Sequence, residues 1–358
     1  MLSLTAMELH GGDIYSLSET LKVPERKIID FSASVNPLGI SNKIKAELRR
    51  HLKFLYHYPD NECRRLRRHI SRHTGIDENR IVCGNGSTEL IYLIVRALGP
   101  ERVLLPVPTF SEYERAIRTY CKNCRIDYLY LQEDNLFRLL PDRFIEALKD
   151  HDMAFICNPN NPTAQSLCMD ELKEIIKEAS KKGCLLVIDE AFIDFEPENT
   201  VTRIFNDISH TIVLRSMTKF YGFAGLRLGY ALLPPDIIDT VKRYKEPWTV
   251  NSLAQRAGVI ALKDNHYRKK TFEYLLKEKQ FLEREFRKLG IDFFPSKINF
   301  YLLRDDRAPE IVTQLRRAGI LVRDCSNFRG LDRRFIRIAV RTHRENAILI
   351  KKLKEIKG

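Results

Sequence analysis

The sequence predicts an α/β fold: a large domain with a mostly parallel sheet sandwiched by helices, joined to a smaller α+β domain. Three observations support this expectation. Short apolar runs alternate with longer amphipathic stretches between residues 81 and 233, the texture becomes helical and highly charged after Pro234, and further strand and helix patterns follow near the end. Repeated strand–helix alternation is typical of parallel sheets covered on both faces.

Strands of the large domain are expected where apolar and β-branched residues run together. They are residues 81–83, 102–106, 125–131, 153–157, 185–188, 211–215 and 228–233. Amphipathic stretches predict helices at 86–98, 110–120, 141–149, 170–182 and 199–207.

The smaller domain follows the change of texture. It is expected to contain long charged helices within 251–290, strands near 298–304 and 335–340 around a helix at 309–318, and a closing helix at 343–356. We therefore predict a large domain at 45–245 and a small one built from 1–44 and 246–358, with an N-terminal arm that crosses to join it.

Composition indicates a globular protein. The chain has 358 residues, of which 44% are apolar and 30% charged, which is ordinary for a globular domain. No apolar run approaches the roughly 18–20 residues that span a bilayer, and the N-terminus lacks the pattern of a signal peptide. Eight cysteines lie scattered, with Cys121 and Cys124 the one close pair. We expect reduced thiols, no metal site, no membrane contact and a cytoplasmic location.

The formal net charge of +13 admits several partners. The densest basic cluster, residues 64–73, fits a helix with Leu66 and Ile70 inward and its arginines in solvent. No aromatic stacking platform is interleaved with it, so nucleic acid is not expected as a partner. A field that attracts phosphorylated small molecules is the functional alternative to a plain solvated helix face.

One lysine stands in a distinctive setting. The apolar run from Ile212 ends in Ser216, Thr218 and Lys219, and a glycine-punctuated segment carrying Arg227 follows. A lysine placed like this can form a Schiff base with an aldehyde cofactor, whose phosphate the two hydroxyls and the arginine can hold. Taken alone, the segment fits equally well a buried strand followed by a solvated lysine.

Two upstream segments favour the cofactor interpretation. Asn161 follows the apolar run 153–157, and Asp189 ends the run 185–188. Open α/β sheets bind ligands at the carboxyl ends of their strands, so Asn161, Asp189 and Lys219 are predicted to meet in one crevice. There Asp189 can pair with a pyridinium nitrogen and Asn161 can hydrogen-bond a ring hydroxyl.

A glycine-containing turn, Gly84–Glu89, follows another strand and opens a helix. The N-terminus of a helix offers free N–H groups and a positive dipole end to an anion. Gly86, Ser87 and Thr88 therefore form a second candidate phosphate-binding element, although a simple helix cap by Ser87 or Thr88 explains the turn as well.

These motifs resemble the fold-type I family of pyridoxal-phosphate enzymes, within it the histidinol-phosphate aminotransferase branch, over nearly the whole chain. The two ends are more similar to the threonine-phosphate decarboxylases of cobalamin biosynthesis. The segments that carry this similarity are His10–Gly12 and Asp30–Gly39 near the start, and Ile320–Leu331 and Phe335–Arg341 near the end.

The resemblance implies roles for further residues. Pyridoxal 5'-phosphate is the implied cofactor, bound by Gly86, Ser87, Thr88, Asn161, Asp189, Ser216, Thr218, Lys219 and Arg227, with Phe110 stacked on its ring. Tyr58 matches a tyrosine that reaches the cofactor phosphate of a neighbouring subunit, which implies a homodimer with shared active sites. His10, Gly11, Ser34, Asn161, Arg323 and Arg337 are the implied substrate-binding residues, with Trp248 near the site.

The sequence departs from the family pattern at three places. Phe192 stands where many aminotransferases have a tyrosine that bonds the ring oxygen, Ala164 replaces a glycine, and Ser34 stands where relatives commonly have asparagine. The first places more of the ring-oxygen contact on Asn161, the second alters a turn, and the third bears on the choice between threonine phosphate and serine phosphate.

The reaction depends on how the substrate is oriented. Arg337 lies on an apolar strand facing the same way as Phe335 and Ala339, and an inward arginine is costly unless an anion or an internal ion pair meets it. If Arg323 and Arg337 take a substrate phosphate, decarboxylation of an O-phosphorylated amino acid is favoured. Histidinol-phosphate transamination is the main alternative, and a cofactor-sensing regulator or a nucleic-acid binder are remote ones.

Overall fold

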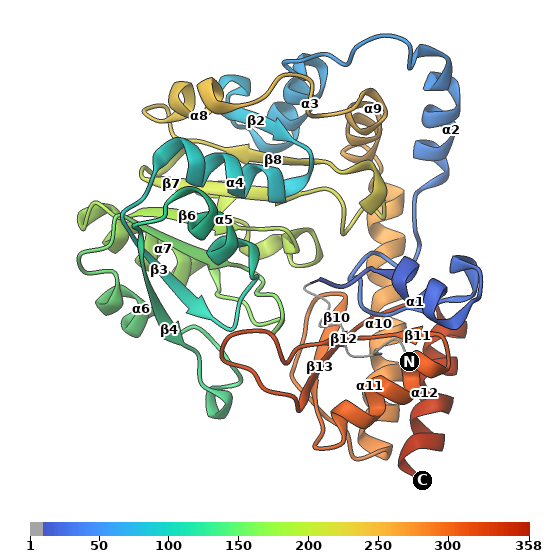
Figure 1. The fold of residues 1–358 in the computed structure, drawn as a ribbon. Helices are drawn as coiled ribbons and strands as arrows, with labels where there is room; N and C mark the ends of the chain where they lie inside the picture. Colours follow the sequence, from blue (N-terminus) through green and yellow to red (C-terminus); the bar gives the residue numbers. More distant parts are fainter. Residues whose placement is uncertain (1–9) are drawn as a thin grey trace.

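The computed structural model describes residues 10–358 (Figure 1). Its larger sheet has seven strands in the order β2-β8-β7-β6-β5-β3-β4. They are β2 (Ile81–Gly84), β3 (Arg102–Val107), β4 (Arg125–Tyr130), β5 (Met153–Cys157), β6 (Leu185–Asp189), β7 (Thr211–Ser216) and β8 (Gly229–Leu232). Strand β8 is antiparallel to both of its neighbours, and the other pairs are parallel. All seven strands lie where the sequence predicts them.

Alternating side chains of these strands enter two separate cores. Leu105, Phe155 and Val187 pack under α4 (Gly86–Leu98), α5 (Glu112–Tyr120) and α8 (Ile238–Tyr244). Ile156 and Ile188 point to the other face, which α6 (Pro141–Ala147) and α7 (Met169–Lys181) cover. Because side chains alternate along a strand, apolar residues on both sides require helices on both faces, as the sequence predicts.

The helix predicted at 199–207 is present, but it is a 3-10 helix and not an α-helix. This segment forms two 3-10 helices, η6 (Pro197–Asn199) and η7 (Val201–Asp207). The buried Glu190 carboxylate accepts the Val201 N–H at 2.6 Å and the Thr200 hydroxyl at 2.7 Å. Glu190 follows β6 and lies outside the segment, so the residues of 199–207 give no local indication of these contacts.

The smaller α+β part has a four-stranded sheet, in the order β12-β13-β10-β9. Its strands are β9 (Asp292–Phe293), β10 (Phe300–Arg304), β12 (Arg323–Asp324) and β13 (Phe335–Ala339). Helices α10 (Asn265–Lys288), α11 (Ala308–Arg317) and α12 (His343–Lys357) accompany it. Figure 1 shows these orange and red elements beside the blue N-terminal residues.

The N-terminal residues join this smaller part through a short parallel pair. Strand β1 (Ile29–Asp30) pairs with β11 (Ile320–Leu321), and α1 (Ile14–Leu21) precedes it. Three further helices, α2 (Asn42–His51), α3 (Arg64–Thr74) and α9 (Ser252–Ala261), lie together at the other end of the molecule. Leu66 and Ile70 of α3 are buried, as its apolar spacing predicts.

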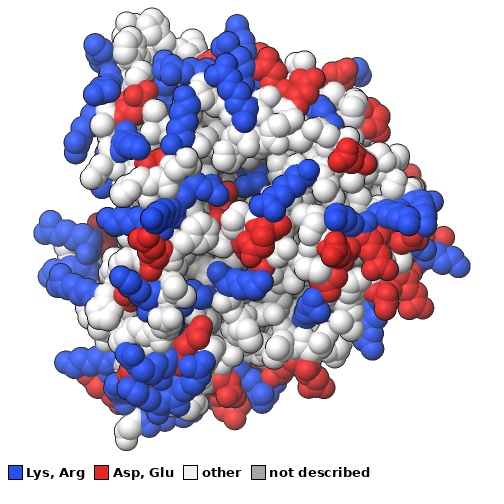
Figure 2. Space-filling model, turned by 180° about the vertical axis from the view of Figure 1, so that it is seen from behind, with Lys and Arg blue, Asp and Glu red and all other residues white. Residues whose placement is uncertain are grey.

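Two surface features bear on partners. Basic side chains are interspersed with acidic ones over the face shown in Figure 2. Within residues 10–358, no helix is long and apolar enough to cross a membrane.

Candidate active site

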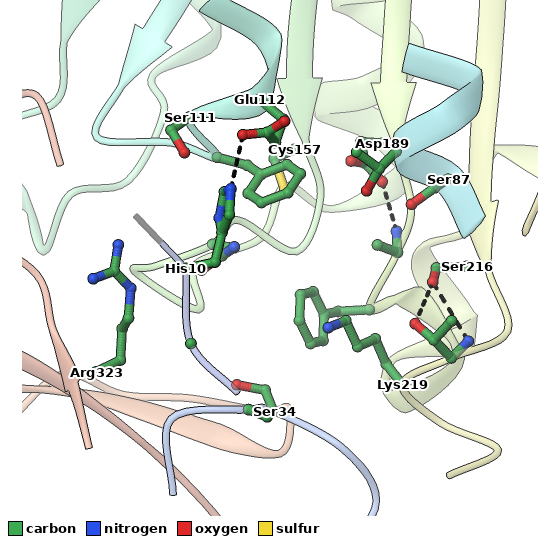
Figure 3. A pocket seen from close by; sticks show the side chains of 18 of the residues that line it. His10, Ser34, Ser87, Ser111, Glu112, Cys157, Asp189, Ser216, Lys219 and Arg323 are labelled. Carbon is green, nitrogen blue, oxygen red and sulfur yellow. Dashed lines mark hydrogen bonds and ion pairs between the residues drawn. The ribbon is translucent and has the colours of Figure 1, made fainter. Parts of the chain in front are cut away.

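A cavity of about 460 Å³ opens at the carboxyl ends of the parallel strands (Figure 3). This volume lies in the range of small-molecule sites. The structure brings fourteen of the predicted residues to its wall, namely His10, Gly11, Ser34, Ser87, Thr88, Phe110, Asn161, Asp189, Ser216, Thr218, Lys219, Arg227, Arg323 and Arg337. Side chains from both sheets and from the N-terminal segment therefore meet at one place.

The topology of the large sheet explains why the cavity lies at these strand ends. After β3 the chain moves outward to β4 and then returns to β5 on the other side of β3. Such a reversal leaves a crevice at the strand ends. Phe110 follows β3, Asn161 follows β5, and Asp189 ends β6, so the reversal delivers three of the predicted residues to the cavity.

Lys219 lies just beyond β7 and is held through its backbone by the N-terminal segment. Its carbonyl accepts the Asn36 N–H at 2.9 Å, and the Asn36 amide donates to the Phe220 carbonyl at 2.7 Å. Gly222 has φ +71°, and a Cβ there would lie 2.5 Å from the Gly39 backbone. The lysine loop thus depends on close packing against residues 36–39.

The Lys219 amine has a lowered pKa. Burial, together with the charges of Arg337 and Arg227, brings the pKa of Lys219 to about 8. No hydrogen bond to Nζ occurs within the described part of the chain; the Phe192 ring centroid lies 5.8 Å from it. At pH 7 roughly a tenth of such an amine is neutral, far more than for an ordinary lysine, so it can act as a nucleophile or move a proton.

Asp189 is held from two sides. Its Oδ2 accepts the Tyr113 hydroxyl at 2.7 Å, and its Oδ1 accepts the Ala191 N–H at 2.9 Å. Burial raises the pKa of Asp189 to about 6, although these hydrogen bonds and the charge of Lys219 oppose the rise. A buried carboxylate of this kind is ready to pair with a cation placed in the cavity.

Hydroxyl groups and one arginine surround the start of α4. Ser216 and Thr218 are hydrogen-bonded at 2.8 Å, and Ser87 lies in the first turn of the helix. Gly86 has φ +82°, and a Cβ there would collide with the Arg227 guanidinium. Several hydroxyl donors, a helix N-terminus and a guanidinium together suit a phosphate dianion.

The Arg337 side chain reaches from β13 of the small sheet to Asn161, which follows β5 of the large sheet. Its guanidinium donates to the Asn161 Oδ1 and, at 2.7 Å, to the Ser32 carbonyl. Within residues 10–358 its Nε is buried without a partner, and its hydrogen-bond acceptors are an amide oxygen and a backbone carbonyl, with no carboxylate among them. Burial, reinforced by Arg323, lowers the pKa of Arg337 to about 10. The internal ion pair weighed from the sequence is therefore absent from the described residues.

Two aromatic residues lie away from the cavity wall. Tyr58 is 81% exposed and Trp248 is 51% exposed, with their ring centroids 5.0 Å apart. Within one chain Trp248 does not line the cavity, because its ring packs on Tyr58 at the surface, so its place near the site stays a prediction. The role predicted for Tyr58 needs a second subunit, so it stays a prediction.

Sequence reasoning missed several residues of the site. Ser32, Ser111, Glu112, Arg115, Cys157, Ala191 and Phe328 also line the cavity, and Asn36 and Tyr113 contact Lys219 and Asp189 directly. The segment from Pro108 to Tyr113 carries Phe110, Ser111 and Glu112 side by side. The sequence did contain a signal for Glu112. It lies two residues after Phe110, which was predicted to stack on the cofactor ring, and therefore close to the same strand end.

Comparison with known proteins agrees with this geometry. The family model for aminotransferase class I and II matches residues 26–353. The chain is 35% identical over 352 residues to the threonine-phosphate decarboxylase of Salmonella typhimurium, covering 97% of this chain and 96% of that protein. The chain belongs to the class I and II aminotransferase family.

Two solved structures share the fold closely. The histidinol-phosphate aminotransferase of Clostridium acetobutylicum superposes with a TM-score of 0.86 at 30% identity, covering 92% of this chain and 99% of that one. The L-threonine-O-3-phosphate decarboxylase of Porphyromonas gingivalis gives a TM-score of 0.81 at 28% identity, with the same coverage. The chain is thus a fold-type I enzyme that depends on pyridoxal 5'-phosphate.

The residues present fit this cofactor. Lys219 offers an amine without a hydrogen-bond partner in residues 10–358, Asp189 a buried carboxylate, and the start of α4 a set of phosphate donors. Each chemical group of pyridoxal phosphate — aldehyde, ring nitrogen and phosphate — finds a matching side chain in the same cavity.

Proposed function

We propose that the protein decarboxylates L-threonine O-3-phosphate, and O-phospho-L-serine as a smaller alternative, to an aminoalcohol phosphate for the nucleotide loop of cobalamin or a related corrinoid. The observation that carries the proposal is Arg337, a buried guanidinium with an unpartnered Nε at the wall of the cavity. Arg323 and His10 line the same end. The names of the Salmonella and Porphyromonas relatives support this substrate.

The proposed roles of the remaining residues follow from their chemistry. Bound pyridoxal phosphate supplies the electron sink that stabilises negative charge at the substrate Cα. Asp189 holds the ring nitrogen protonated, Asn161 bonds the ring oxygen, and Phe110 covers the ring. Gly86, Ser87, Thr88, Ser216, Thr218 and Arg227 hold the cofactor phosphate.

Substrate binding decides which bond breaks. Arg323, Arg337 and His10 take the substrate anions, and Gly11 and Ser34 shape the wall beside them. Cleavage of the bond between Cα and the carboxylate releases CO₂ and leaves the electron pair at Cα. Lys219 then delivers a proton to Cα, a task suited to an amine whose pKa is about 8.

A homodimer with shared sites is part of the proposal. Exposed apolar side chains gather on the segment after α2 and near Trp248, namely Leu52, Leu55, Tyr56 and Tyr58. Clusters of this kind mark protein–protein contact surfaces. Tyr58 would then reach the partner's cofactor phosphate. We also propose a cytoplasmic location, which all eight free cysteines fit.

The test is a product assay on purified, cofactor-loaded protein. O-phospho-L-threonine and O-phospho-L-serine are supplied separately, with no keto acid, and CO₂ and the phosphorylated amine are measured. Catalytic release of CO₂ is expected. If none appears, and histidinol phosphate is converted once 2-oxoglutarate is added, the protein is an aminotransferase and the decarboxylase proposal fails.

A further inference from the structure

The cavity contains a carboxylate that the proposed reaction does not use. Five cationic side chains line the wall, namely Arg115, Lys219, Arg227, Arg323 and Arg337. In the described residues only Asp189 and Glu112 bring carboxylates to it. Asp189 has a cationic partner in the cofactor, whereas Glu112 is aimed at a region proposed to bind an anionic substrate, where a second negative charge is unfavourable.

Glu112 is deeply buried and held in one position. It is 5% exposed, and it starts α5 directly after the loop that carries Phe110. Its Oε2 accepts the Tyr92 hydroxyl at 2.8 Å, and its Oε1 contacts the His10 Nε2 at 2.9 Å. Burial raises the pKa of Glu112, but the hydrogen bonds from His10 and Tyr92 outweigh it, so the pKa is lowered. The carboxylate is therefore charged near neutral pH.

The backbone of the segment that carries His10 is fixed by the residues that follow it, within the described part of the chain. The Gly12 N–H donates to the Ser32 hydroxyl at 2.7 Å, and Ser32 in turn donates to Asp30 at 2.6 Å. A Cβ on Gly11 would collide with the Ser32 carbonyl. These contacts place the backbone of residues 10–12. The imidazole itself packs near the Phe110 ring, with the ring centroids 6.1 Å apart, and its polar contact in the described residues is the one to Glu112 (Figure 3).

We propose that Glu112 is a positioning residue that fixes His10 so that its second ring nitrogen, Nδ1, meets the phosphate of the substrate. This inference rests on the proposed function, because it assigns the phosphate of that substrate to His10. When Glu112 accepts from Nε2, a protonated imidazole still has the Nδ1–H to donate to a phosphate oxygen. Glu112 thereby connects α5 of the large domain to the N-terminal segment across the cavity.

The sign of the effect distinguishes positioning from simple electrostatics. Arg115 Nη1 lies 3.5 Å from Glu112 Oε1. If Glu112 acted only as a charge, its neutralisation would remove a repulsion, release Arg115 and strengthen anion binding. Positioning predicts weaker binding, because His10 loses the partner that aims it.

The experiment is a double-mutant cycle on the cofactor-loaded enzyme, with the variants Glu112→Gln, His10→Ala and the pair. Two readouts are taken: KM and kcat for O-phospho-L-threonine, and the Kd of inorganic phosphate by calorimetry. We expect Glu112→Gln to raise both KM and the phosphate Kd roughly tenfold, with kcat changed by less than about threefold. In the His10→Ala background the same change should have no further effect, because coupled residues are not additive.

Glu114→Gln is the matched control. It removes the same charge two residues along α5, where the carboxylate contacts Arg118 and Arg329 outside the cavity. It should leave both readouts unchanged. Tyr92→Phe removes the hydrogen bond to Glu112 Oε2. It should also raise the phosphate Kd, by less than Glu112→Gln does, and it replaces Glu112→Gln as the test variant if that protein fails to fold.

Three outcomes would overturn the inference: tighter phosphate binding by Glu112→Gln, additive effects of the Glu112 and His10 changes, or an equal loss in Glu114→Gln. Failure of the proposed function looks different. In that case the wild-type enzyme releases no CO₂ from either phosphorylated amino acid, while the phosphate Kd values still report whether Glu112 acts through His10.

Discussion

Arg323 and Arg337 are directly opposite each other on the antiparallel strands β12 and β13, and their side chains are 4% and 6% exposed. Like charges on facing residues of a sheet destabilise it. The Arg337 guanidinium also stacks over Phe300, 5.1 Å from the ring centroid, and it contacts only neutral acceptors in the described residues. An anion that entered the cavity would stabilise the Arg337 guanidinium.

Replacement of Arg337 by Gln should therefore impair substrate binding. We expect KM for O-phospho-L-threonine to rise roughly 10- to 1,000-fold, the range for loss of a buried charged hydrogen-bond partner. Steady-state kinetics on the cofactor-loaded protein measures this. Arg334→Gln, at an arginine that pairs with Asp332 on the surface, is the control and should retain the wild-type KM. An unchanged KM in Arg337→Gln would remove this arginine from the substrate site.

Replacement of Lys219 by Ala should abolish the covalent bond to the cofactor. The visible absorbance band of the bound cofactor should disappear, and the rate should fall by at least roughly 10²–10⁴, the contribution of a positioned proton-transfer group. Lys279→Ala is the matched control and should keep the absorbance band. Burial also lowers the pKa of Lys279 to about 8, but this lysine lies outside the cavity. Persistence of the band in Lys219→Ala would mean that another amine binds the cofactor.

Lys219 should also make the stability of the cofactor-free protein depend on pH. Its pKa falls from 10.5 in the unfolded chain to about 8 in the fold. Between these pH values the unfolded chain holds more protons, so the unfolding free energy of the wild type rises with pH. Below pH 8 the cost of burying the amine is fully present.

Lys219→Met removes this cost. The variant should be more stable than the wild type at pH 7 by up to about 3 kcal/mol, and the difference should vanish as the pH approaches 10.5. Urea unfolding of both cofactor-free proteins at several pH values tests it. A difference that is constant with pH would show that the amine is not titrating in the fold as described.

Tyr113→Phe should weaken cofactor binding. The Tyr113 hydroxyl is a hydrogen-bond donor to Asp189, and its loss should move the pKa of Asp189 above the present value of about 6. The Kd of pyridoxal phosphate should rise by roughly fivefold to tenfold, the effect of one buried hydrogen bond, and more at pH 6 than at pH 8. Titration followed by absorbance measures it. Tyr120→Phe, at an exposed tyrosine of the same helix, should bind normally.

Ser34→Asn should shift the preference between the two substrates. Ser34 lines the cavity and is 1% exposed. Its buried hydroxyl has no hydrogen-bond partner in residues 10–358. A larger side chain takes space from the substrate methyl group, so the ratio of kcat/KM for threonine phosphate over serine phosphate should fall by roughly tenfold. Ser34→Ala, which keeps the volume, should leave the ratio unchanged. Equal ratios in all three proteins would place Ser34 away from the substrate side chain.

Local pattern was sufficient for the elements that carry the cofactor site. The strand ending at Asp189 is apolar up to that residue, and the strand ending at Ser216 has an apolar centre, residues 212–214, followed by polar residues at its end. The inward direction of Arg337 follows from strand alternation, and the structure places it on β13 facing the cavity. The 3-10 form of 201–207 was missed because its hydrogen-bond acceptor, Glu190, lies just after β6, eleven positions earlier in the chain.

The sequence by itself determined where strands and helices follow one another along the chain and which polar residues stand at the strand ends. These features depend on hydrophobic periodicity and turn residues, which involve only a few neighbouring positions. The tertiary structure decided which of these residues meet. Arg337 contacts Ser32 across 305 positions and Asn161 across 176, and His10 of the N-terminal segment reaches Glu112 at the start of α5. Such contacts depend on how two sheets pack and on where the chain reverses in the large one, and neither leaves a local period in the sequence.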